Sequence, residues 1–258
     1  MSDTLQDQPT SMTSNQRNGG LVRAVRVVGW TCIWIGLFLL GFVGHQLFIT
    51  TWLAQQNNTQ LANEAEDYFS TAQVDTIAYT PPTIPDSDSS QGSGDTPPPD
   101  TTAGEPATLL VEAPPPDGQP FAIIRIPTIE RLVDGWTVVE GVTRSDLKNG
   151  AGHMPTTPLP GQPGNAVISG HRTTYGAPFH ELDELEPGDL IEVETAIGVH
   201  TYAVSETIIV RPTELWVIQE RPGAWLTLTT CHPKFSARQR LIVFAELVDG
   251  PNAEAIFG

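Results

Sequence analysis

The stretch Trp225–Leu247 reads WLTLTTCHPKFSARQRLIVFAEL. It holds two apolar runs of the kind that form β-strands, joined by a polar segment, so we expect two strands connected by a loop. Cys231 ends the first run, and Arg240 opens the second run nine residues later. This spacing predicts a thiol at the mouth of the loop, with a permanently charged guanidinium at the start of the next strand. Because positive charge favours the thiolate over the thiol, the stretch indicates that Cys231 is a nucleophile.

A base for this thiol is offered by His171, in the segment Asn165–Tyr175, which reads NAVISGHRTTY. An apolar run there ends at a glycine, so the pattern predicts a strand with His171 and Arg172 where the chain enters a loop. An imidazole that titrates near neutral pH is suited to general acid and base catalysis. Taken singly, His171, Cys231 and Arg240 could be a solvated loop histidine, a small core residue and a surface charge. Their joint occurrence favours a catalytic site.

Two neighbouring features are not expected to take part in chemistry. His232 lies beside Cys231, but adjacent residues of a strand face opposite ways, so a direct catalytic role is not predicted. Asp183, Glu184 and Glu186 bring three carboxylates together, but no ligand-spaced loop with a turn glycine accompanies them. We interpret them as a solvated helix face and not as a calcium site.

Residues 117–258 have the usual size of one domain and are expected to be all-β with short helices. Short apolar runs separated by Gly, Pro, Asn and Asp favour a closed barrel or a sandwich over a βαβ fold. Short helices fit only at residues 145–150, around 179–185 and at 213–219. The predicted strands are Phe121–Ile126, Thr137–Val142, Asn165–Ser169, Leu190–Glu194, Val199–Val210, Trp225–Thr230 and Leu241–Leu247.

The composition excludes several functional classes. The formal net charge of −17 argues against nucleic acid as a partner, because a phosphate-binding face needs clustered Lys and Arg. The sequence contains no P-loop, no GxGxxG after a strand, no HExxH and no CxxC, so we expect no metal and no cofactor. Of the two cysteines, Cys32 falls in an apolar segment near the N-terminus. Cys231 is therefore expected to be a free thiol.

The N-terminal part predicts a membrane anchor. Residues 1–26 are expected to be a cytoplasmic tail, and residues 27–49 a transmembrane helix, since Val27–Phe48 is almost continuously apolar and has no formal charge. A signal peptide is the rival interpretation, but the run is longer than the usual apolar region of one, and no A-x-A site follows. Arg23 and Arg26 precede the run, and the positive-inside rule then places the N-terminus in the cytoplasm and the rest of the chain outside.

Residues 50–116 are expected to be an extracellular tether. From Thr80 to Pro116 the sequence is rich in Pro, Thr, Ser, Asp and Gly, with too little apolar surface to offset the cost of ordering its backbone. Residues 55–73 show only a weak helical pattern. The tether holds ten acidic residues and no Lys or Arg, which would keep it away from an anionic surface. We expect a disordered, semi-stiff spacer.

The motifs as a set resemble the sortases, the membrane-anchored cysteine transpeptidases of Gram-positive bacteria. Leu159–Arg172 reads LPGQPGNAVISGHR, and TLTTC is followed nine residues after its cysteine by Arg240 and LIVFAEL. The resemblance is greatest to the class E sortases of actinobacteria. It rests on the segment TLTTCHPKFSARQR, the loop HRTTYGAPF and the acidic Pro-rich tether. The resemblance covers roughly residues 118–248 and implies an eight-stranded β-barrel, with His171, Cys231 and Arg240 converging at one groove.

The resemblance also implies a reaction and its partners. A sortase cleaves a C-terminal sorting motif of the LAxTG or LPxTG type between Thr and Gly, forms a thioacyl intermediate on its cysteine, and passes the acyl group to an amine of peptidoglycan. The partners would be secreted proteins that carry this sorting signal and a peptidoglycan precursor or cross-bridge. Tyr175 could narrow the groove in favour of Ala over Pro, and Ser169 and Thr230 could bond the substrate backbone.

Two alternatives remain open from the sequence. One is a pilus-polymerising sortase that uses a pilin lysine as the acceptor, although the Asp-Pro-aromatic lid motif usual in that class is not found before the domain. The other is a non-catalytic wall-binding module on a tether, in which Cys231 would be inert. Alkylation by a charged thiol reagent separates the last alternative from the enzymes, because an inert buried cysteine reacts slowly.

Overall fold

The computed structural model describes residues 16–44, 50–80 and 107–258. Predictions that fall on residues 1–15, 45–49 and 81–106 lie outside the described residues, including most of the cytoplasmic tail and the Pro-rich middle of the tether. Packing divides the chain into two units, Met1–Thr50 and Thr51–Gly258. The second unit contains all the predicted site residues.

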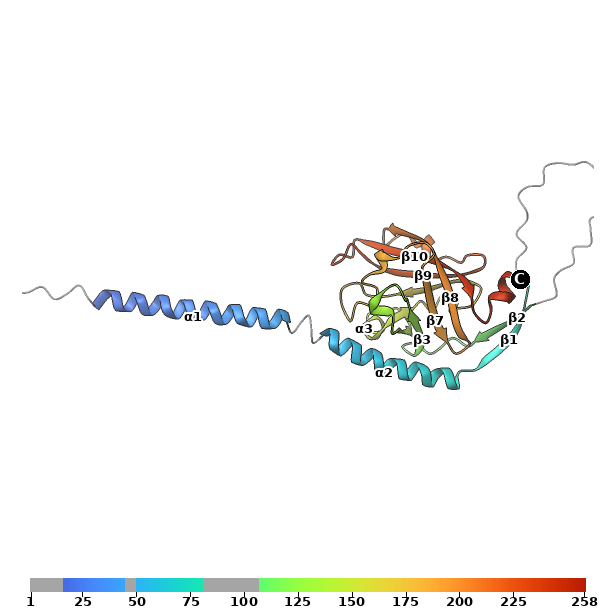
Figure 1. Ribbon diagram of the computed structural model, residues 1–258, viewed down its shortest axis with the longest axis horizontal. Helices are drawn as coiled ribbons and strands as arrows, with labels where there is room; N and C mark the ends of the chain where they lie inside the picture. The colour runs from blue at the N-terminus through green and yellow to red at the C-terminus, as the bar shows by residue number, and fades with distance from the viewer. Residues whose placement is uncertain (1–15, 45–49, 81–106) are drawn as a thin grey trace, which may run out of the picture. The chain divides into compact units, whose positions relative to one another are not determined.

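The second unit is built around a closed barrel of eight strands, in the order β10-β8-β7-β3-β4-β5-β6-β9 (Figure 1). Most neighbours are antiparallel, but β4 pairs with β5, and β6 with β9, in parallel. The strands are β3 (Pro120–Arg125), β4 (Trp136–Glu140), β5 (Ala151–His153), β6 (Gly164–Ser169), β7 (Leu190–Thr195), β8 (Gly198–Val210), β9 (Ala224–His232) and β10 (Gln239–Asp249). The predicted eight-stranded all-β barrel is confirmed.

Alternation along the strands decides what fills the barrel. In β9, Leu226 and Leu228 are fully buried in the main core, and they pair with Ala245 and Val243 of β10, which are also fully buried there. Residues one position away face outward, because side chains alternate along a strand. Cys231 therefore belongs to the outward-facing set of β9.

All seven predicted strands are present, and the eighth, β5, is the one that the sequence did not indicate. It has only three residues, Ala151–His153, too few to show an alternating pattern. The predicted short helices also appear, as α3 (Asp146–Asn149) and the 3₁₀ turns η3 (Leu182–Glu184) and η4 (Leu215–Ile218). A further 3₁₀ turn, η2 (Glu130–Leu132), and the short C-terminal helix α4 (Ala253–Phe257) complete the domain.

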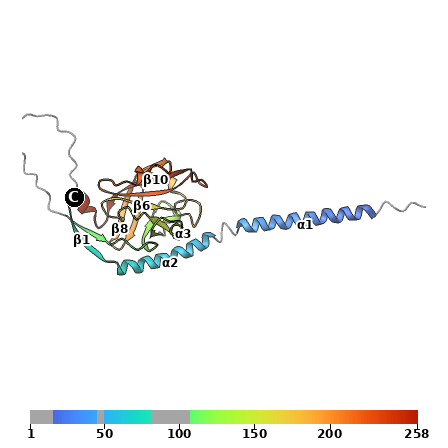
Figure 2. The same cartoon turned by 180° about the vertical axis from the view of Figure 1, so that it is seen from behind.

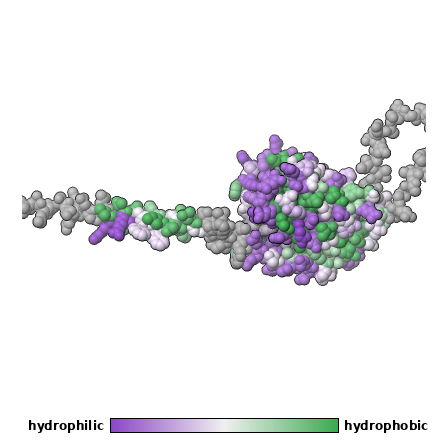
Figure 3. Space-filling view, viewed as in Figure 1, coloured by the Kyte–Doolittle hydropathy of each residue, from purple (hydrophilic) through white to green (hydrophobic). Residues whose placement is uncertain are grey.

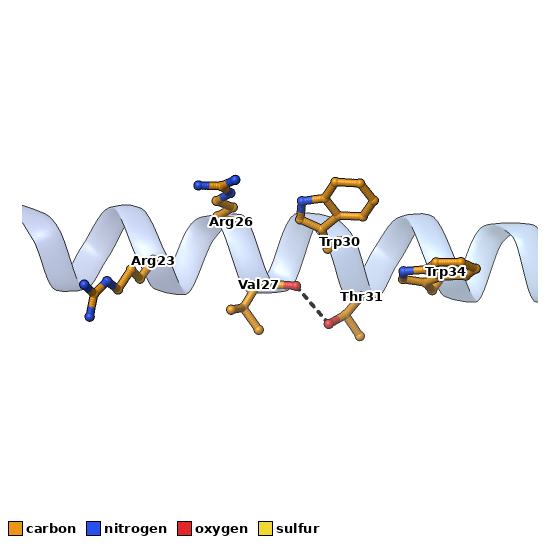
Figure 4. Close-up of a pocket in the computed structure, with 6 residues that line it drawn as sticks. All are labelled: Arg23, Arg26, Val27, Trp30, Thr31 and Trp34. Carbon is orange, nitrogen blue, oxygen red and sulfur yellow. Dashed lines mark hydrogen bonds between the residues drawn. The ribbon is translucent and has the colours of Figure 1, made fainter.

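The first unit contains the helix α1 (Gln16–Gly44), whose segment Val22–Phe42 is long and apolar enough to cross a membrane. Figure 3 shows hydrophobic side chains along this helix, with hydrophilic ones at its N-terminal part. Figure 4 shows Arg23 and Arg26 on the N-terminal side of Trp30 and Trp34 along this helix. The Thr31 hydroxyl donates to the carbonyl of Val27 at 2.9 Å, which satisfies it within the helix, as a lipid environment requires. The helix is compatible with a single-pass anchor.

The prediction that residues 50–116 form a tether needs correction at both ends. Residues 50–71 form the helix α2 (Thr50–Thr71), which lies along the barrel in both views (Figure 1, Figure 2). Asn58 fixes this helix to β4: its side-chain oxygen accepts from the Thr137 amide at 2.8 Å, and its side-chain nitrogen donates to the Gly135 carbonyl at 3.2 Å. The helical pattern was weak because most of α2 is polar and exposed, and Ala65 alone is fully buried among its side chains from residue 53 onward.

The C-terminal end of the predicted tether is also part of the fold. The strand β2 (Ala107–Glu112) pairs in antiparallel fashion with β1 (Val74–Tyr79), and Leu109 of β2 is buried in the main core. The fully buried Asn252 accepts from the Leu110 amide and donates to its carbonyl, both at 2.9 Å. The folded domain therefore includes α2, β1 and β2 and does not begin at residue 117.

Glu112, at the end of β2, leads to a prediction about stability. It is 7% exposed, and both of its carboxylate oxygens are buried. Burial raises the pKa of Glu112 from its ordinary value of 4.5 to about 7. The folded state thus holds this proton more tightly than the unfolded chain, and stability falls as the pH rises from about 4.5 to about 7. Glu112→Gln should remove this loss and be more stable than the wild type at pH 8, by at most about 3 kcal/mol.

The measurement is urea unfolding of both proteins at pH 4 and pH 8. At pH 4 the two should differ much less, because the wild-type carboxyl is largely protonated in both states. Glu66→Gln, at an exposed position of α2, serves as the matched control and should show no such pH dependence. An equal difference between variant and wild type at the two pH values would contradict the prediction.

Candidate active site

Cys231 and Arg240 are brought together by the pairing of β9 with β10. The two residues are direct partners in this antiparallel ladder. Side chains of direct partners lie on the same face of a sheet, about 5 Å apart at Cβ, so the thiol and the guanidinium share one side of the barrel wall. Cys231 is a free, partly exposed thiol, as the sequence predicted. The cation predicted at the start of the next strand is thus beside the thiol.

His171 reaches the same place through the parallel pairing of β6 with β9. The last partners in the ladder are Ser169 and Thr229, and the Gly170 amide continues it by donating to the Thr229 carbonyl at 3.0 Å. The Thr230 hydroxyl then donates to the Gly170 carbonyl at 2.8 Å. The next residues of the two chains are His171 and Cys231. The distant strand β6 and the consecutive strands β9 and β10 therefore bring His171, Cys231 and Arg240 to adjacent strand ends.

The residues around Cys231 divide between the two faces of the barrel wall. Ser169, Thr229 and Cys231 belong to the outward-facing set, and Ser169 and Thr229 are partly exposed. Thr230 is 3% exposed, and its hydroxyl is bound to the Gly170 carbonyl, so it supports the end of β6. The roles predicted for Ser169 and Thr230 in substrate binding stay predictions. Thr229, two residues before Cys231, lies on the same face of β9 as the cysteine. The sequence did not indicate it as a site residue.

The surroundings of His171 favour a neutral imidazole. Nε2 of His171 is buried and has no hydrogen-bond partner among the described residues. No hydrogen bond therefore joins Nε2 to Cys231 in this structure. Burial lowers the pKa of His171 below its ordinary value of 6.5. The Tyr175 ring lies beside the imidazole, with centroids 5.0 Å apart and planes tilted by 44°. The unpartnered Nε2 leaves one ring nitrogen free to exchange a proton.

The Arg240 guanidinium is held by its own loop. Its Nη1 donates to the carbonyls of Ala237 and Gln239, both at 3.0 Å. Within the described residues, no carboxylate lies within ion-pair distance of it. A guanidinium that is fixed in place but not neutralised can stabilise negative charge that develops nearby.

The loop from His171 to Phe179 has an unusual backbone. Tyr175, Gly176 and Ala177 are all left-handed, with φ of 51°, 77° and 48°. Such a conformation strains residues that carry a Cβ, and strain of this kind occurs at sites where the surrounding structure imposes it. The loop closes on itself, because the Phe179 amide donates to the His171 carbonyl at 3.1 Å. Its geometry is thus imposed by its contacts.

Arg172 connects this loop to the cysteine, a role that the sequence did not reveal. Its side chain is 2% exposed and donates through Nη1 to the Cys231 carbonyl at 3.2 Å and to Nδ1 of His232 at 2.9 Å. Its Nη2 forms an ion pair with Asp183 at 2.8 Å. An arginine cannot act as an acceptor, so Nδ1 of His232 must be unprotonated. The buried Arg172 side chain thus links the loop that begins at His171 to the backbone of Cys231.

One of the acidic residues near the site, Asp183, forms ion pairs with two basic side chains. Asp183 pairs with Arg172 and lies 3.6 Å from Nζ of Lys234. Partial burial acts to raise the pKa of Asp183, but a backbone hydrogen bond and the Arg172 guanidinium outweigh it and hold the pKa below its ordinary value. Over the part of the chain that the structure describes, no three His, Cys, Asp or Glu residues are grouped to hold a metal ion.

Arg172→Lys is expected to impair both stability and the alignment of the site. A lysine has one nitrogen and cannot bond the Cys231 carbonyl, His232 and Asp183 together as a planar guanidinium does. Losing buried charge-assisted hydrogen bonds should lower the free energy of unfolding by about 2 kcal/mol. If the proposal for the reaction below is right, turnover of a substrate peptide should also fall about tenfold, with a small effect on KM, because the histidine loses its alignment with the thiol.

The matched control is Arg238→Lys, at an exposed arginine of the loop between β9 and β10. Thermal unfolding and steady-state kinetics of the two variants are compared with the wild type. Equal turnover in Arg172→Lys and Arg238→Lys would show that Arg172 does not position the site.

Comparison with known proteins places these residues within one family. A family profile described as "Sortase domain" matches residues 124–248. Sortase D of Bacillus subtilis is 34% identical over 139 residues, which are 52% of this chain and 67% of that protein. Sortase SrtE1 of Streptomyces coelicolor is 26% identical over 250 residues, which are 91% of this chain but only 60% of that protein. The solved structure of sortase E from Streptomyces avermitilis is 37% identical, with 52% of this chain and 90% of that chain covered, at a TM-score of 0.46.

Proposed function

The chain belongs to the sortase family, and from that premise we propose that it is a membrane-anchored cysteine transpeptidase. It cleaves a C-terminal sorting motif of the LAxTG or LPxTG type between Thr and Gly. The released acyl group is held as a thioester on Cys231 and is then transferred to an amine of peptidoglycan. The observation that carries this proposal is the strand register that sets His171, Cys231 and Arg240 side by side.

The first half of the reaction forms the thioester. The Cys231 sulfur attacks the carbonyl carbon of the threonine, and its proton passes to Nε2 of His171. The C–N bond to glycine then breaks, and His171 returns the proton to the departing glycine amine. Splitting one amide exchange into two acyl transfers lowers the barrier of each step. The buried, unpartnered Nε2 of His171 supports this role.

The second half reverses the proton path. The incoming amine attacks the thioester, His171 takes a proton from the amine, and the Cys231 sulfur leaves and recovers a proton. In both halves a negative charge develops on the substrate oxygen, and the cation of Arg240 stabilises it. The pairing of Arg240 with Cys231, and the lack of a described carboxylate near it, support this assignment.

We assign the substrate motif and location on the same basis. The position of Tyr175 against the imidazole supports a role in choosing Ala or Pro in the motif, and Ser169 on the face of Cys231 supports contact with the substrate backbone. The candidate span Val22–Phe42, preceded in the sequence by Arg17, supports an anchored enzyme with a cytoplasmic N-terminus and an extracellular catalytic domain. Its partners would be secreted proteins with a sorting signal and a peptidoglycan precursor or cross-bridge.

The test uses the full chain in detergent micelles, incubated with LAxTG or LPxTG peptides and with glycine-based amines, a lysine peptide or no acceptor. Mass spectrometry should find an acyl adduct on Cys231 and transfer products that require an amine. Preferred transfer to the lysine peptide would indicate pilus polymerisation instead. Absence of both adduct and cleavage, from a folded protein, would leave only the non-catalytic wall-binding module.

A further inference from the structure

The helix that follows the candidate membrane span in the sequence touches the catalytic loop. Ala54, in the first turn of α2, packs against Gly176: a Cβ added to Gly176 would lie 3.0 Å from the Ala54 Cβ and would overlap the Trp136 ring. Gly176 follows Tyr175 directly, within the loop that begins at His171. The start of α2 therefore lies against the backbone of the loop that carries the catalytic imidazole.

A second contact of α2 leads to the same imidazole. Nδ2 of Asn57 donates to the carbonyl of Asn149, the last residue of α3, at 3.2 Å. Both views show α3 near the N-terminal half of α2 (Figure 1, Figure 2). In the same short helix, Nζ of Lys148 lies 5.7 Å from the centroid of the Tyr175 ring. Since this ring packs on His171, a continuous set of contacts runs from α2 through α3 to the imidazole.

Asn58 keeps α2 in the position that these contacts need. Besides its side-chain bonds to β4, its carbonyl accepts from the Thr137 hydroxyl at 3.3 Å. Thr137 follows Trp136, and the Trp136 ring packs against Gly176. Asn58 thus fixes the position of α2 relative to β4, the strand whose Trp136 contacts the catalytic loop.

The catalytic loop is of a kind that depends on such support. Three successive left-handed residues are costly and persist only where contacts impose them. Nη1 of Arg131, in η2, donates to the Gly176 carbonyl at 3.1 Å. Ala54 of α2 and the Trp136 ring contact the same glycine. Loss of the α2 contact would remove one of the groups that hold the loop in this conformation.

We propose that α2 is a positioning element of the active site, with Ala54 and Asn58 as positioning residues that hold the loop from His171 to Phe179 in its catalytic geometry. The sequence predicted that this segment is a spacer. In the folded chain it supports the site, and it begins at Thr50, shortly after α1 ends at Gly44. The test of this inference by enzyme kinetics rests on the proposed function. Its test by alkylation of Cys231 does not.

The first test is Ala54→Arg in the full chain, compared with Gln55→Arg. The two variants add the same side chain to neighbouring positions, but Ala54 faces Gly176 and Gln55 is exposed. Ala54→Arg should lower kcat about tenfold with KM changed less than about twofold, because the imidazole loses its alignment while the groove remains. Gln55→Arg should behave as the wild type.

The second test follows alkylation of Cys231 by iodoacetamide as a function of pH, by peptide mass spectrometry, in Asn58→Ala and in Gln60→Ala. Asn58 bonds β4, whereas the Gln60 side chain bonds only Glu64 of its own helix. Asn58→Ala should shift the pH profile of alkylation, because a displaced imidazole no longer accepts the thiol proton as readily. Gln60→Ala should not shift it.

The outcomes are separable. If Ala54→Arg and Asn58→Ala lower only the melting temperature and leave kcat and the alkylation profile unchanged, α2 merely stabilises the domain and the inference is wrong. If the wild type shows no turnover, the proposed function fails, and the alkylation profile alone still decides whether α2 positions His171. An unshifted profile in a folded Asn58→Ala protein would reject the inference in that case as well.

Discussion

Cys231→Ala is expected to abolish cleavage and transfer of a sorting-motif peptide while the barrel stays folded. The methyl group cannot form a thioester, and the amide then has no covalent route to the acceptor amine. Where the nucleophile of a covalent catalyst is removed, the loss is very large, so kcat should fall by at least about 10⁴-fold. The side chain is only partly buried and on the outer face of β9, so the melting temperature should change little.

The control for this experiment is the other cysteine of the chain. Cys32→Ala changes a thiol in α1, and it should cleave the peptide at the wild-type rate. Product formation is followed by liquid chromatography, and the acyl adduct by mass spectrometry of the intact protein. Residual turnover of Cys231→Ala within a hundredfold of the wild type would exclude Cys231 as the nucleophile.

The parts of the site that the sequence predicted are those in which a local pattern determines the geometry. The alternating runs of β9 and β10 predicted two strands and a loop, and this was enough to pair Cys231 with Arg240. The segment that ends in SGHR predicted a strand followed by a loop, and the parallel ladder of β6 with β9 then brings His171 to the cysteine. Which strands pair in parallel is a property of the whole fold, and no pattern in the sequence predicted it.

The features that the sequence did not predict depend on packing between distant segments. The helix α2 is mostly polar, and its place on the barrel is decided by a few groups, above all Asn58. Likewise, Arg172 ends the segment that carries the family resemblance, but its contacts come from the carbonyl, imidazole and carboxylate that the fold brings to its guanidinium. β5 is held by pairing with β4 and β6, although it is too short for a pattern of its own. Composition and periodicity describe single segments and cannot report such contacts.

The catalytic assignment and the proposed support by α2 both concern the orientation of one imidazole. No hydrogen bond to Nε2 of His171 is present among the described residues. The Tyr175 ring packs beside the imidazole, and the left-handed backbone from Tyr175 to Ala177 sets where that ring lies. Contacts of Arg131 and Ala54 with Gly176 therefore bear on the position of the imidazole.

The second large effect is expected for His171→Gln. Glutamine keeps a polar side chain of similar reach but cannot exchange a proton near neutral pH, so kcat should fall by about 10³-fold, the middle of the range for general acid and base catalysis. The pH dependence is the more specific result. Because burial lowers the pKa of His171 below 6.5, the imidazole is neutral at pH 7 and able to accept the thiol proton. In the wild type, kcat/KM should therefore be retained down to pH 6.5 and decrease only below it, as His171 becomes protonated in the free enzyme.

The residual activity of His171→Gln should lack this decrease, because the group that titrates has been removed. His232→Gln is the matched control: His232 lies beside the cysteine and against Arg172, it takes no proton in the proposed reaction, and its variant should keep the acidic decrease of the wild type. The rates are measured from pH 4.5 to 8.5 with one sorting-motif peptide, and the folded fraction is checked at each pH. If the decrease survives in His171→Gln and disappears in His232→Gln, the proton acceptor is the second histidine. The roles assigned from the strand register would then have to be exchanged.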